Sequence, residues 1–283
     1  MAVARKRKAV KTGGASRNTS AAGRKPRSVR AQVSREEWET RVNLAACYRL
    51  MDVYEMTDLI ANHISMRVPG EPDHFLINAY GMLYEEITAS SLIKIDHEGN
   101  IIAKPDFGPG LDYGVNRAGF VIHSAIHMAK PDVNCVIHTH TWAGMAVSTM
   151  KCGLLPNTQT SMRFAEISYH DYEGVVIDTA LRDRLVEDLG DNNAMILRNH
   201  GLLTVSTTIR EAFEFMYYLD CACQIQVDAA AAGSLNIMGD NLAAKSGADM
   251  DRFAEREATF GDLEFAAMVR KMDKEKKDTS WRN

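Results

Sequence analysis

The chain has 283 residues, of which 46% are hydrophobic, and a formal net charge of −4. Such a chain can bury one sizeable core, and no apolar run approaches the roughly 20 residues of a membrane span or resembles a secretory signal. The five cysteines form no Cys-x-x-Cys pair, which is typical of free thiols in a reducing, cytoplasmic compartment.

The charges are unevenly divided along the chain. Residues 1–30 hold ten Lys and Arg residues and no acidic one, which leaves 23 basic and 37 acidic residues in the rest. An acidic body argues against nucleic acid as the main partner. Residues 1–33 also have almost no large apolar groups, so they cannot offset the entropy lost on ordering. We therefore expect a disordered basic tail over residues 1–33.

The first helix is predicted to begin just after this tail. Ser34 and Glu37 have the spacing of a capping box, in which each residue satisfies a backbone N–H of the other. Trp38, Val42 and Ala45 then fall on one face. These features indicate an amphipathic helix packed against the core.

Short strands follow this helix. Apolar, β-branched runs at 64–68, 75–78, 92–96 and 101–103 are separated by Gly-containing turns. The last two runs flank Glu98-Gly99-Asn100, which is typical of a hairpin. The pattern predicts antiparallel pairing in this part of the chain.

A second helix is predicted after Asn116. Phe120, His123 and His127 recur at helical spacing, and the pattern stops before Pro131. We expect His127 to cap this helix or to face solvent. His123 is a candidate acid–base group or fourth metal ligand, or a histidine packed on the sheet.

Two later histidines follow directly on an apolar strand. Residues 133–137 lead into His138 and His140, and side chains two apart on a strand point the same way. Residues 194–199 form a second apolar run that ends in His200 and Gly201. A lone histidine would favour a core or turn role, but three converging imidazoles form a ligand set suited to Zn²⁺, Mn²⁺ or Fe²⁺. The sequence therefore predicts one divalent metal ion at His138, His140 and His200.

The remaining elements complete an α/β pattern. Residues 180–190 are predicted to be helical, and a second capping box at Thr208 opens a long helix that ends at Gly233. Strands and helices alternate irregularly, which favours a sheet covered by helices. We expect one domain over residues 34–233 and a C-terminal extension over 234–283.

Taken together, these motifs resemble the class II aldolase/adducin family. The resemblance covers about residues 36–232 and implies a three-layer fold with a central, mainly antiparallel sheet flanked by helices. It also implies a homotetramer with active sites at subunit interfaces, and it assigns the family's three zinc-binding histidines to His138, His140 and His200. The matching stretches are residues 75–88, the helix through His123, Pro131-Asp132, His138-Thr139-His140 and Arg198-Asn199-His200-Gly201.

The chain departs from the family's aldolases at the active site. The aldolases' catalytic glutamate lies four residues before a helix histidine that matches His123, and here that position is Gly119. The positions of their phosphate cradle are occupied by Asn62-His63, Tyr80-Gly81 and Arg117-Ala118. The chain resembles the adducin-like branch, with which it shares residues 85–91 and 169–174. That branch includes cytoskeletal proteins without known catalysis and many bacterial proteins of uncertain function.

These positions supply the candidate substrate site. His63, Tyr80, Gly81 and Arg117 are the predicted substrate-binding residues. Arg117 is also a catalytic candidate together with His123, because a guanidinium can donate two parallel hydrogen bonds to a planar carboxylate. An ordinary surface arginine is the alternative. In the loop after residue 168, His170 and Asp171 are expected to form a hydrogen-bonded pair close to the metal.

Three functional classes fit these observations. The favoured one is a metal-dependent lyase or decarboxylase acting on a small, non-phosphorylated hydroxy or keto carboxylate, with zinc as the favoured metal and iron or manganese as alternatives. A non-haem iron oxygenase acting on a 2-oxo or 2-hydroxy acid is the second class. A non-catalytic, adducin-like interaction module is the third. Retention of all three histidines weakens the third class, because an interaction module needs no ligand geometry.

Overall fold

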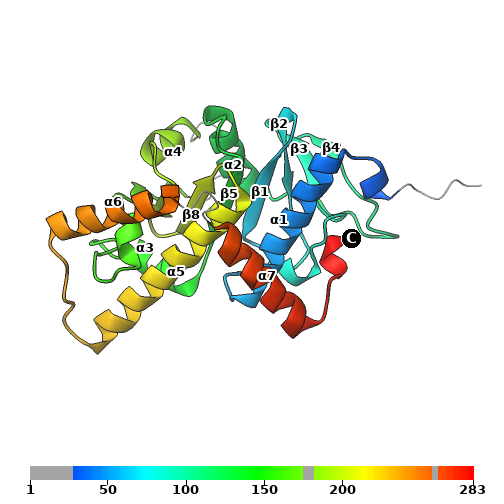
Figure 1. The fold of residues 1–283 in the computed structure, drawn as a ribbon. Helices are drawn as coiled ribbons and strands as arrows, with labels where there is room; N and C mark the ends of the chain where they lie inside the picture. The colour runs from blue at the N-terminus through cyan, green and yellow to red at the C-terminus, as the bar shows by residue number, and fades with distance from the viewer. Residues whose placement is uncertain (1–27, 175–181, 257–260) are drawn as a thin grey trace, which may run out of the picture.

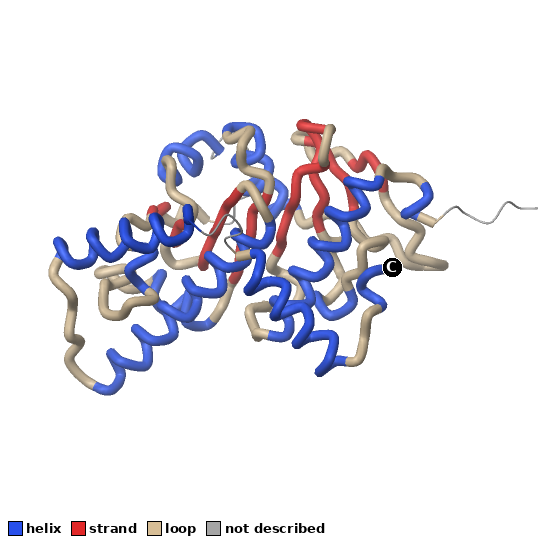
Figure 2. Tube along the Cα trace, viewed as in Figure 1, coloured by secondary structure: helices blue, strands red, loops and turns tan. Residues whose placement is uncertain are grey.

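An eight-stranded sheet runs through the centre of the molecule and is covered by helices on both faces (Figures 1 and 2). The structure is a computed structural model that describes residues 28–174, 182–256 and 261–283. The strand order is β4-β3-β2-β1-β5-β8-β7-β6. All neighbours are antiparallel except β6 and β7, which are parallel. The strands are β1 (His63–Val68), β2 (Glu71–Ile77), β3 (Ile93–Asp96), β4 (Ile101–Ala103), β5 (Cys135–Thr139), β6 (Ser168–His170), β7 (Ala194–Leu197) and β8 (Gly201–Ser206).

The helices divide between the two faces of the sheet (Figure 1). One face is covered by α1 (Arg35–Val53), α3 (Trp142–Ser148), α5 (Ile209–Ala232) and α7 (Asp262–Lys276), which share one apolar core. The other face is covered by α2 (Arg117–Ala129) and α4 (Arg182–Leu189). A further helix, α6 (Asp240–Arg256), packs against the short 3₁₀ helix η3 (Ser161–Phe164). The predicted three-layer α/β fold is therefore confirmed. Within the described residues, no helix has both the length and the apolar character that crossing a membrane requires.

Strand β5 lies in the middle of the sheet, and its position explains where the histidines meet. It pairs with β1, where His138 faces His63, and with β8, where His138 faces Leu203. Strand β8 was not expected from the sequence, because Gly201 resembled the end of a strand. Instead, the turn between β7 and β8 reverses the chain through Asn199, which has φ +56°. His200 lies in that turn.

The helix starts follow the capping pattern only in part. The Ser34 hydroxyl accepts from the Glu37 backbone N–H at 3.0 Å, as predicted. The Glu37 carboxylate does not reach back to Ser34. It accepts from Arg41 at 2.9 Å and from Lys94 at 2.7 Å within the protein. The reciprocal half of the predicted capping box is therefore wrong, because this carboxylate neutralises two buried cations.

Residues just before Ser34 and residues of the predicted C-terminal extension both pack against the core. The 3₁₀ helix η1 (Val29–Ala31) lies before Ser34, and both Val29 and Val33 pack against the core of α1 and α5. The tail predicted over residues 1–33 was thus drawn too long, and residues 1–27 lie outside the described residues. At the other end, Phe265, Met272 and Trp281 are buried in that same core.

Candidate metal centre

Three histidine side chains converge beside the end of β5. His138 lies in β5, His140 follows one residue after its end, and His200 lies in the β7–β8 turn. One ring nitrogen from each lies within 4.8 Å of the others. The Nε2 atom of His140 is 2.9 Å from Nε2 of His138 and 3.0 Å from Nε2 of His200. The structure therefore brings together the three residues that the sequence predicted as ligands.

Hydrogen bonds on the far side of two rings fix which nitrogens face the centre. A carbonyl or carboxylate oxygen only accepts, so His138 Nδ1 donates to the Leu202 carbonyl at 2.9 Å and His140 Nδ1 donates to Asp58 Oδ2 at 3.0 Å. In neutral rings, both Nε2 atoms then bear lone pairs that point at each other across 2.9 Å. A cation bound between the two Nε2 atoms would accept both lone pairs, so that the repulsion is replaced by two metal–ligand bonds. The donor set therefore fits a divalent metal.

Burial keeps these rings in the form that a metal requires. Desolvation, followed by the neighbouring His200, His63 and His140, lowers the pKa of His138 well below its usual value. Desolvation and the neighbouring His140 and His170 lower the pKa of His200 to about 4. Both rings are accordingly uncharged at pH 7, and no proton has to leave them before a metal binds.

Two residues support His140 in a way that the sequence analysis did not predict, although Asn62 was named there as a position of the phosphate cradle. Asp58 accepts from its ring, and Asn62 Oδ1 accepts from its backbone N–H at 3.1 Å. Both lie in the loop between α1 and β1, about 80 positions earlier in the chain. No spacing pattern links residues so far apart, so the sequence contained no feature from which these contacts could be found.

Asp58→Asn is expected to weaken metal affinity by about 10- to 100-fold, because the carboxylate that orients the ligand ring and raises its basicity is lost. Asn keeps the size of the side chain, so the fold is expected to be preserved. The measurement is a competition titration against a chromophoric chelator. Asp73→Asn, at an exposed position of β2, is the matched control. Equal affinities for the two variants would contradict the assigned role.

His123 is packed on the sheet, one of the alternatives left open, whereas the position of His127 differs from expectation. His123 Nε2 lies 2.8 Å from His63 Nδ1, and His123 Nδ1 lies 2.6 Å from Ser65 Oγ. With both ring nitrogens engaged inside the protein, His123 has no lone pair left for a metal; its catalytic role stays a prediction. His127 neither caps the helix nor faces solvent, because it is buried with Nε2 2.7 Å from Ser65 Oγ. The stripe of α2 that contains it packs directly onto β1.

Gly119 and His63 fit together by size. A Cβ atom at Gly119 would lie 2.3 Å from His63 Cδ2 and 2.7 Å from His63 Nε2. The His63 ring therefore fills the space beside position 119, where the aldolases that this chain resembles have a glutamate. A glycine on the helix and a large ring on the strand thus share this space.

Gly119→Ala is expected to destabilise the protein by about 1–3 kcal/mol through overpacking. Helix propensity alone predicts the opposite sign, a gain of up to about 1 kcal/mol, so the direction of the change decides between the two effects. The double variant Gly119→Ala with His63→Asn is expected to recover most of the loss, because the smaller amide vacates the space. Denaturant unfolding of the parent, both single variants and the double variant measures the coupling. If the changes in unfolding free energy of the two single variants simply add up in the double variant, the steric coupling between Gly119 and His63 is refuted.

The other predicted substrate residues make local contacts of their own. Arg117 is exposed at the first position of α2. The Tyr80 backbone N–H donates to the Gly114 carbonyl at 2.9 Å. Gly81 has φ +118°, and a Cβ there would lie 2.6 Å from the Tyr113 ring. A glycine is therefore required at this position for steric reasons. In the described part of the chain, no hydrogen bond joins these residues to the histidine cluster, and their substrate role stays a prediction.

The predicted pair of His170 and Asp171 is wrong. His170 lies at the end of β6, and its Nδ1 atom donates to Asp188 Oδ2 of α4 at 2.7 Å. The partner comes from the helix packed over this strand rather than from the adjacent residue, because His170 points inward and is buried while Asp171 is exposed.

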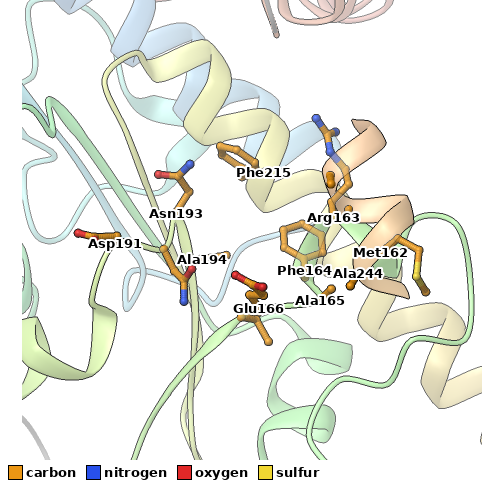
Figure 3. Close-up of a pocket in the computed structure, with 14 residues that line it drawn as sticks. Met162, Arg163, Phe164, Ala165, Glu166, Asp191, Asn193, Ala194, Phe215 and Ala244 are labelled. Atoms are coloured by element: carbon orange, nitrogen blue, oxygen red, sulfur yellow. The ribbon is translucent and has the colours of Figure 1, made fainter. Parts of the chain in front are cut away.

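A separate cavity of about 260 Å³ lies away from these histidines. It is bordered by η3, by residues 191–194 before and at the start of β7, and by one face of α6 (Figure 3). Arg163 and Glu166 contribute charged groups to its lining. None of the predicted site residues borders this cavity.

The fold and the histidine cluster define a three-layer α/β protein with a site suited to one divalent metal. Comparisons with known proteins identify the family to which this fold belongs. The family model described as "Class II Aldolase and Adducin N-terminal domain" matches residues 42–227 of this chain. The chain therefore belongs to the class II aldolase and adducin family.

Relatives of two kinds are similar to this chain. A Pseudomonas aeruginosa protein, provisionally named an aldolase class 2 protein, is 45% identical over 88% of this chain and 95% of its own length. Alpha-adducin of Rattus norvegicus is 41% identical over 82% of this chain, but the match spans only 33% of that protein.

Two solved structures are also similar. The crystal structure of an aldolase II superfamily protein from Pseudomonas syringae has a TM-score of 0.81 at 45% identity, and the match covers 91% of this chain and 100% of that one. L-fuculose 1-phosphate aldolase from Glaciozyma antarctica has a TM-score of 0.74 at 28% identity, with 88% and 93% of the two chains covered.

Proposed function

We propose that this protein is a metal-dependent lyase or decarboxylase that acts on a small, non-phosphorylated hydroxy or keto carboxylate. The observation that carries this proposal is the pair of hydrogen bonds that turn the Nε2 lone pairs of His138 and His140 toward each other. Such an arrangement is costly unless a cation occupies it. An interaction surface would gain nothing from it.

His138, His140 and His200 would hold the metal, with zinc favoured by three imidazole ligands. Bound there, a divalent ion acts as a Lewis acid that polarises a substrate carbonyl or carboxylate. The protein contributes orientation. The Leu202 carbonyl and Asp58 fix two ligand rings, while Asn62 holds the His140 backbone.

The identity of position 119 supports the choice of reaction. Glycine offers no carboxylate to move a proton beside the substrate carbonyl, and the space is filled by His63. Loss of CO₂ needs no base at that point. Two small donors of the aldolases' phosphate cradle are also replaced by His63 and Tyr80, which argues against a sugar phosphate.

A second candidate function is an adducin-like interaction module, which the 41% identity with alpha-adducin favours. The two candidates differ in what they require. A module should tolerate loss of the metal ligands without losing its partner, whereas the enzyme should lose turnover completely.

The proposal is tested on protein purified anaerobically, with its metal identified by elemental analysis. Metal-loaded protein is then offered a panel of hydroxy and keto acids, with and without O₂, and CO₂ release and O₂ uptake are followed. We expect CO₂ release without O₂ uptake and with zinc or manganese bound. Bound iron with O₂ uptake would establish the oxygenase instead. Inactivity of fully loaded protein on every acid would overturn the proposal.

We further propose a homotetramer, on the basis of the family resemblance. Trp142 is 87% exposed and Leu59 is 77% exposed. Trp142 is two residues after His140, and Leu59 directly follows its partner Asp58, so both exposed apolar residues lie close in the chain to the histidine cluster. Trp142→Ala is expected to weaken assembly at micromolar concentration, as measured by light scattering. Leu263→Ala, which alters a 67% exposed residue of α7, is the matched control. A parent protein that is monomeric in this measurement would refute the proposal.

A further inference from the structure

A second cavity, of about 240 Å³, lies between α1 and α7. The two helices lie side by side (Figure 1), and the 3₁₀ helices η2 (Tyr84–Glu86) and η5 (Ser280–Arg282) each add one residue to the lining. None of the predicted site residues lines this α1–α7 cavity. Its volume is below the roughly 300–1,000 Å³ of a pocket for a drug-sized molecule, so it suits a smaller ligand.

One wall of the α1–α7 cavity contains a polar group that has no partner. Trp281 lines the cavity from η5 and is only 3% exposed. Its indole Nε1 atom has no acceptor anywhere in the part of the chain that the structure describes. An indole N–H can only donate, and a buried donor without an acceptor costs free energy. A ligand oxygen bound against this ring would supply the missing acceptor.

The ring of Trp281 is held in a fixed position by its neighbours. The backbone carbonyl of Trp281 accepts from the Ala89 N–H at 2.9 Å. The Arg282 guanidinium lies over one face of the ring, 3.9 Å from its centroid, and donates to Asp273 at 2.7 Å. Because the ring is already fixed, a ligand that accepts from its N–H does not have to order it first.

Two cationic side chains line the cavity and keep donors available for an anionic group. Arg49 donates through Nε to the Ile87 carbonyl at 2.9 Å and through Nη1 to Asp278 at 3.3 Å, whereas its Nη2 atom makes no hydrogen bond within the described residues. Lys276 Nζ lies 3.5 Å from Asp52 Oδ2, beyond the roughly 2.7–2.9 Å of a charge-assisted hydrogen bond. A ligand carboxylate can therefore accept from Arg49 without breaking either of its present bonds.

A carboxylate without a partner lines the same cavity. Glu85 is exposed, and it makes no hydrogen bond or ion pair in the described part of the chain. It belongs to residues 85–91, the run shared with the adducin-like branch, which the proposed function leaves unexplained. The charged lining consists of two cations and three carboxylates, which gives a net charge of −1. A simple anion is therefore disfavoured, whereas a molecule with both an ammonium and a carboxylate group matches these charges.

We propose that the α1–α7 cavity binds a free α-amino acid with an aliphatic side chain. The carboxylate of the ligand accepts from the Trp281 indole N–H and from Arg49 Nη2, and its ammonium group donates to Glu85. Its side chain lies against Val53 and Met272, which are apolar residues of the lining. This site shares no residue with the metal centre, so it does not depend on the proposed function.

Isothermal titration calorimetry of full-length, metal-loaded protein tests the proposal with L-leucine and two analogues that each lack one charged group. Isopentylamine lacks the carboxylate, and isocaproate lacks the ammonium group. We expect L-leucine to bind once per chain at millimolar concentration or below, and each analogue to bind at least about tenfold more weakly. Absence of leucine binding at millimolar concentration, or an analogue that binds as tightly as leucine, would overturn the proposal.

Two substitutions locate the bound amino acid. Trp281→Phe removes the indole N–H and Glu85→Gln removes the negative charge, and each is expected to weaken leucine binding at least about tenfold. The matched controls, which should bind leucine like the parent, are Trp38→Phe, in the same apolar core but outside the cavity lining, and Glu275→Gln, at an exposed position of α7. Unchanged leucine binding in Glu85→Gln, or in folded Trp281→Phe, would show that the amino acid binds elsewhere and that the proposal is wrong. If Trp281→Phe does not fold, Glu85→Gln still decides, because its position is exposed.

Discussion

Replacing His140 by alanine is expected to abolish stoichiometric metal binding. Its Nε2 atom is the central one of the cluster, 2.9 Å from His138 Nε2 and 3.0 Å from His200 Nε2. The substitution leaves two imidazoles, which is fewer than the three protein ligands usual for a catalytic zinc site. Loss of a residue that merely orients a ligand costs about 10- to 100-fold in affinity, so loss of the ligand should exceed that.

Elemental analysis after dialysis against a weak chelator gives the measurement. His74→Ala is the control, because His74 lies in β2 and pairs with Glu71 at 2.7 Å, outside the cluster. The parent and the control should hold one metal per chain, and His140→Ala should hold almost none. Full occupancy in His140→Ala would show that the metal binds elsewhere.

The local part of this site was predictable from the sequence. Alternation along β5 places His138 and His140 on one side, and the apolar run before His200 places this residue after a strand. Both inferences depend on neighbours within a few residues, where backbone geometry limits the possibilities. The apolar runs of the strands were found for the same reason. Strand β8 was missed because the β7–β8 turn depends on a positive φ at Asn199, which no periodic pattern reveals.

The parts that were missed depend on contacts between distant segments. Asp58 reaches His140 from the α1–β1 loop, and His63 meets Gly119 across the interface between β1 and α2. The resemblance to the aldolases drew attention to the missing glutamate at Gly119. It could not show that a ring from β1 fills the vacated volume, since that depends on how the helix packs on the sheet. His127 was misjudged for the same reason: α2 buries its polar stripe against β1 instead of exposing it.

The packing of the His63 ring against Gly119 also bears on what the site can catalyse. In the aldolases that this chain resembles, a carboxylate at position 119 handles the proton next to the substrate carbonyl. Here the nearest group is His63, and burial lowers its pKa well below the usual value. A ring with a low pKa is a weak base, and its Nδ1 atom is engaged by His123 at 2.8 Å. Loss of a general base typically costs on the order of 10²- to 10⁴-fold in rate.

Cleavage of L-fuculose 1-phosphate is therefore expected to be at least about 10²-fold slower than with an aldolase that has the glutamate. The Glaciozyma antarctica L-fuculose 1-phosphate aldolase, 28% identical to this chain, serves as the positive control under matched metal loading. Gly119→Glu alone is not an informative rescue, because a side chain there collides with the His63 ring. The double variant Gly119→Glu with His63→Asn makes room for the carboxylate and is expected to gain aldol cleavage over the parent. Efficient cleavage by the parent protein would show that another residue supplies the base and would refute the assignment of a decarboxylase-type reaction.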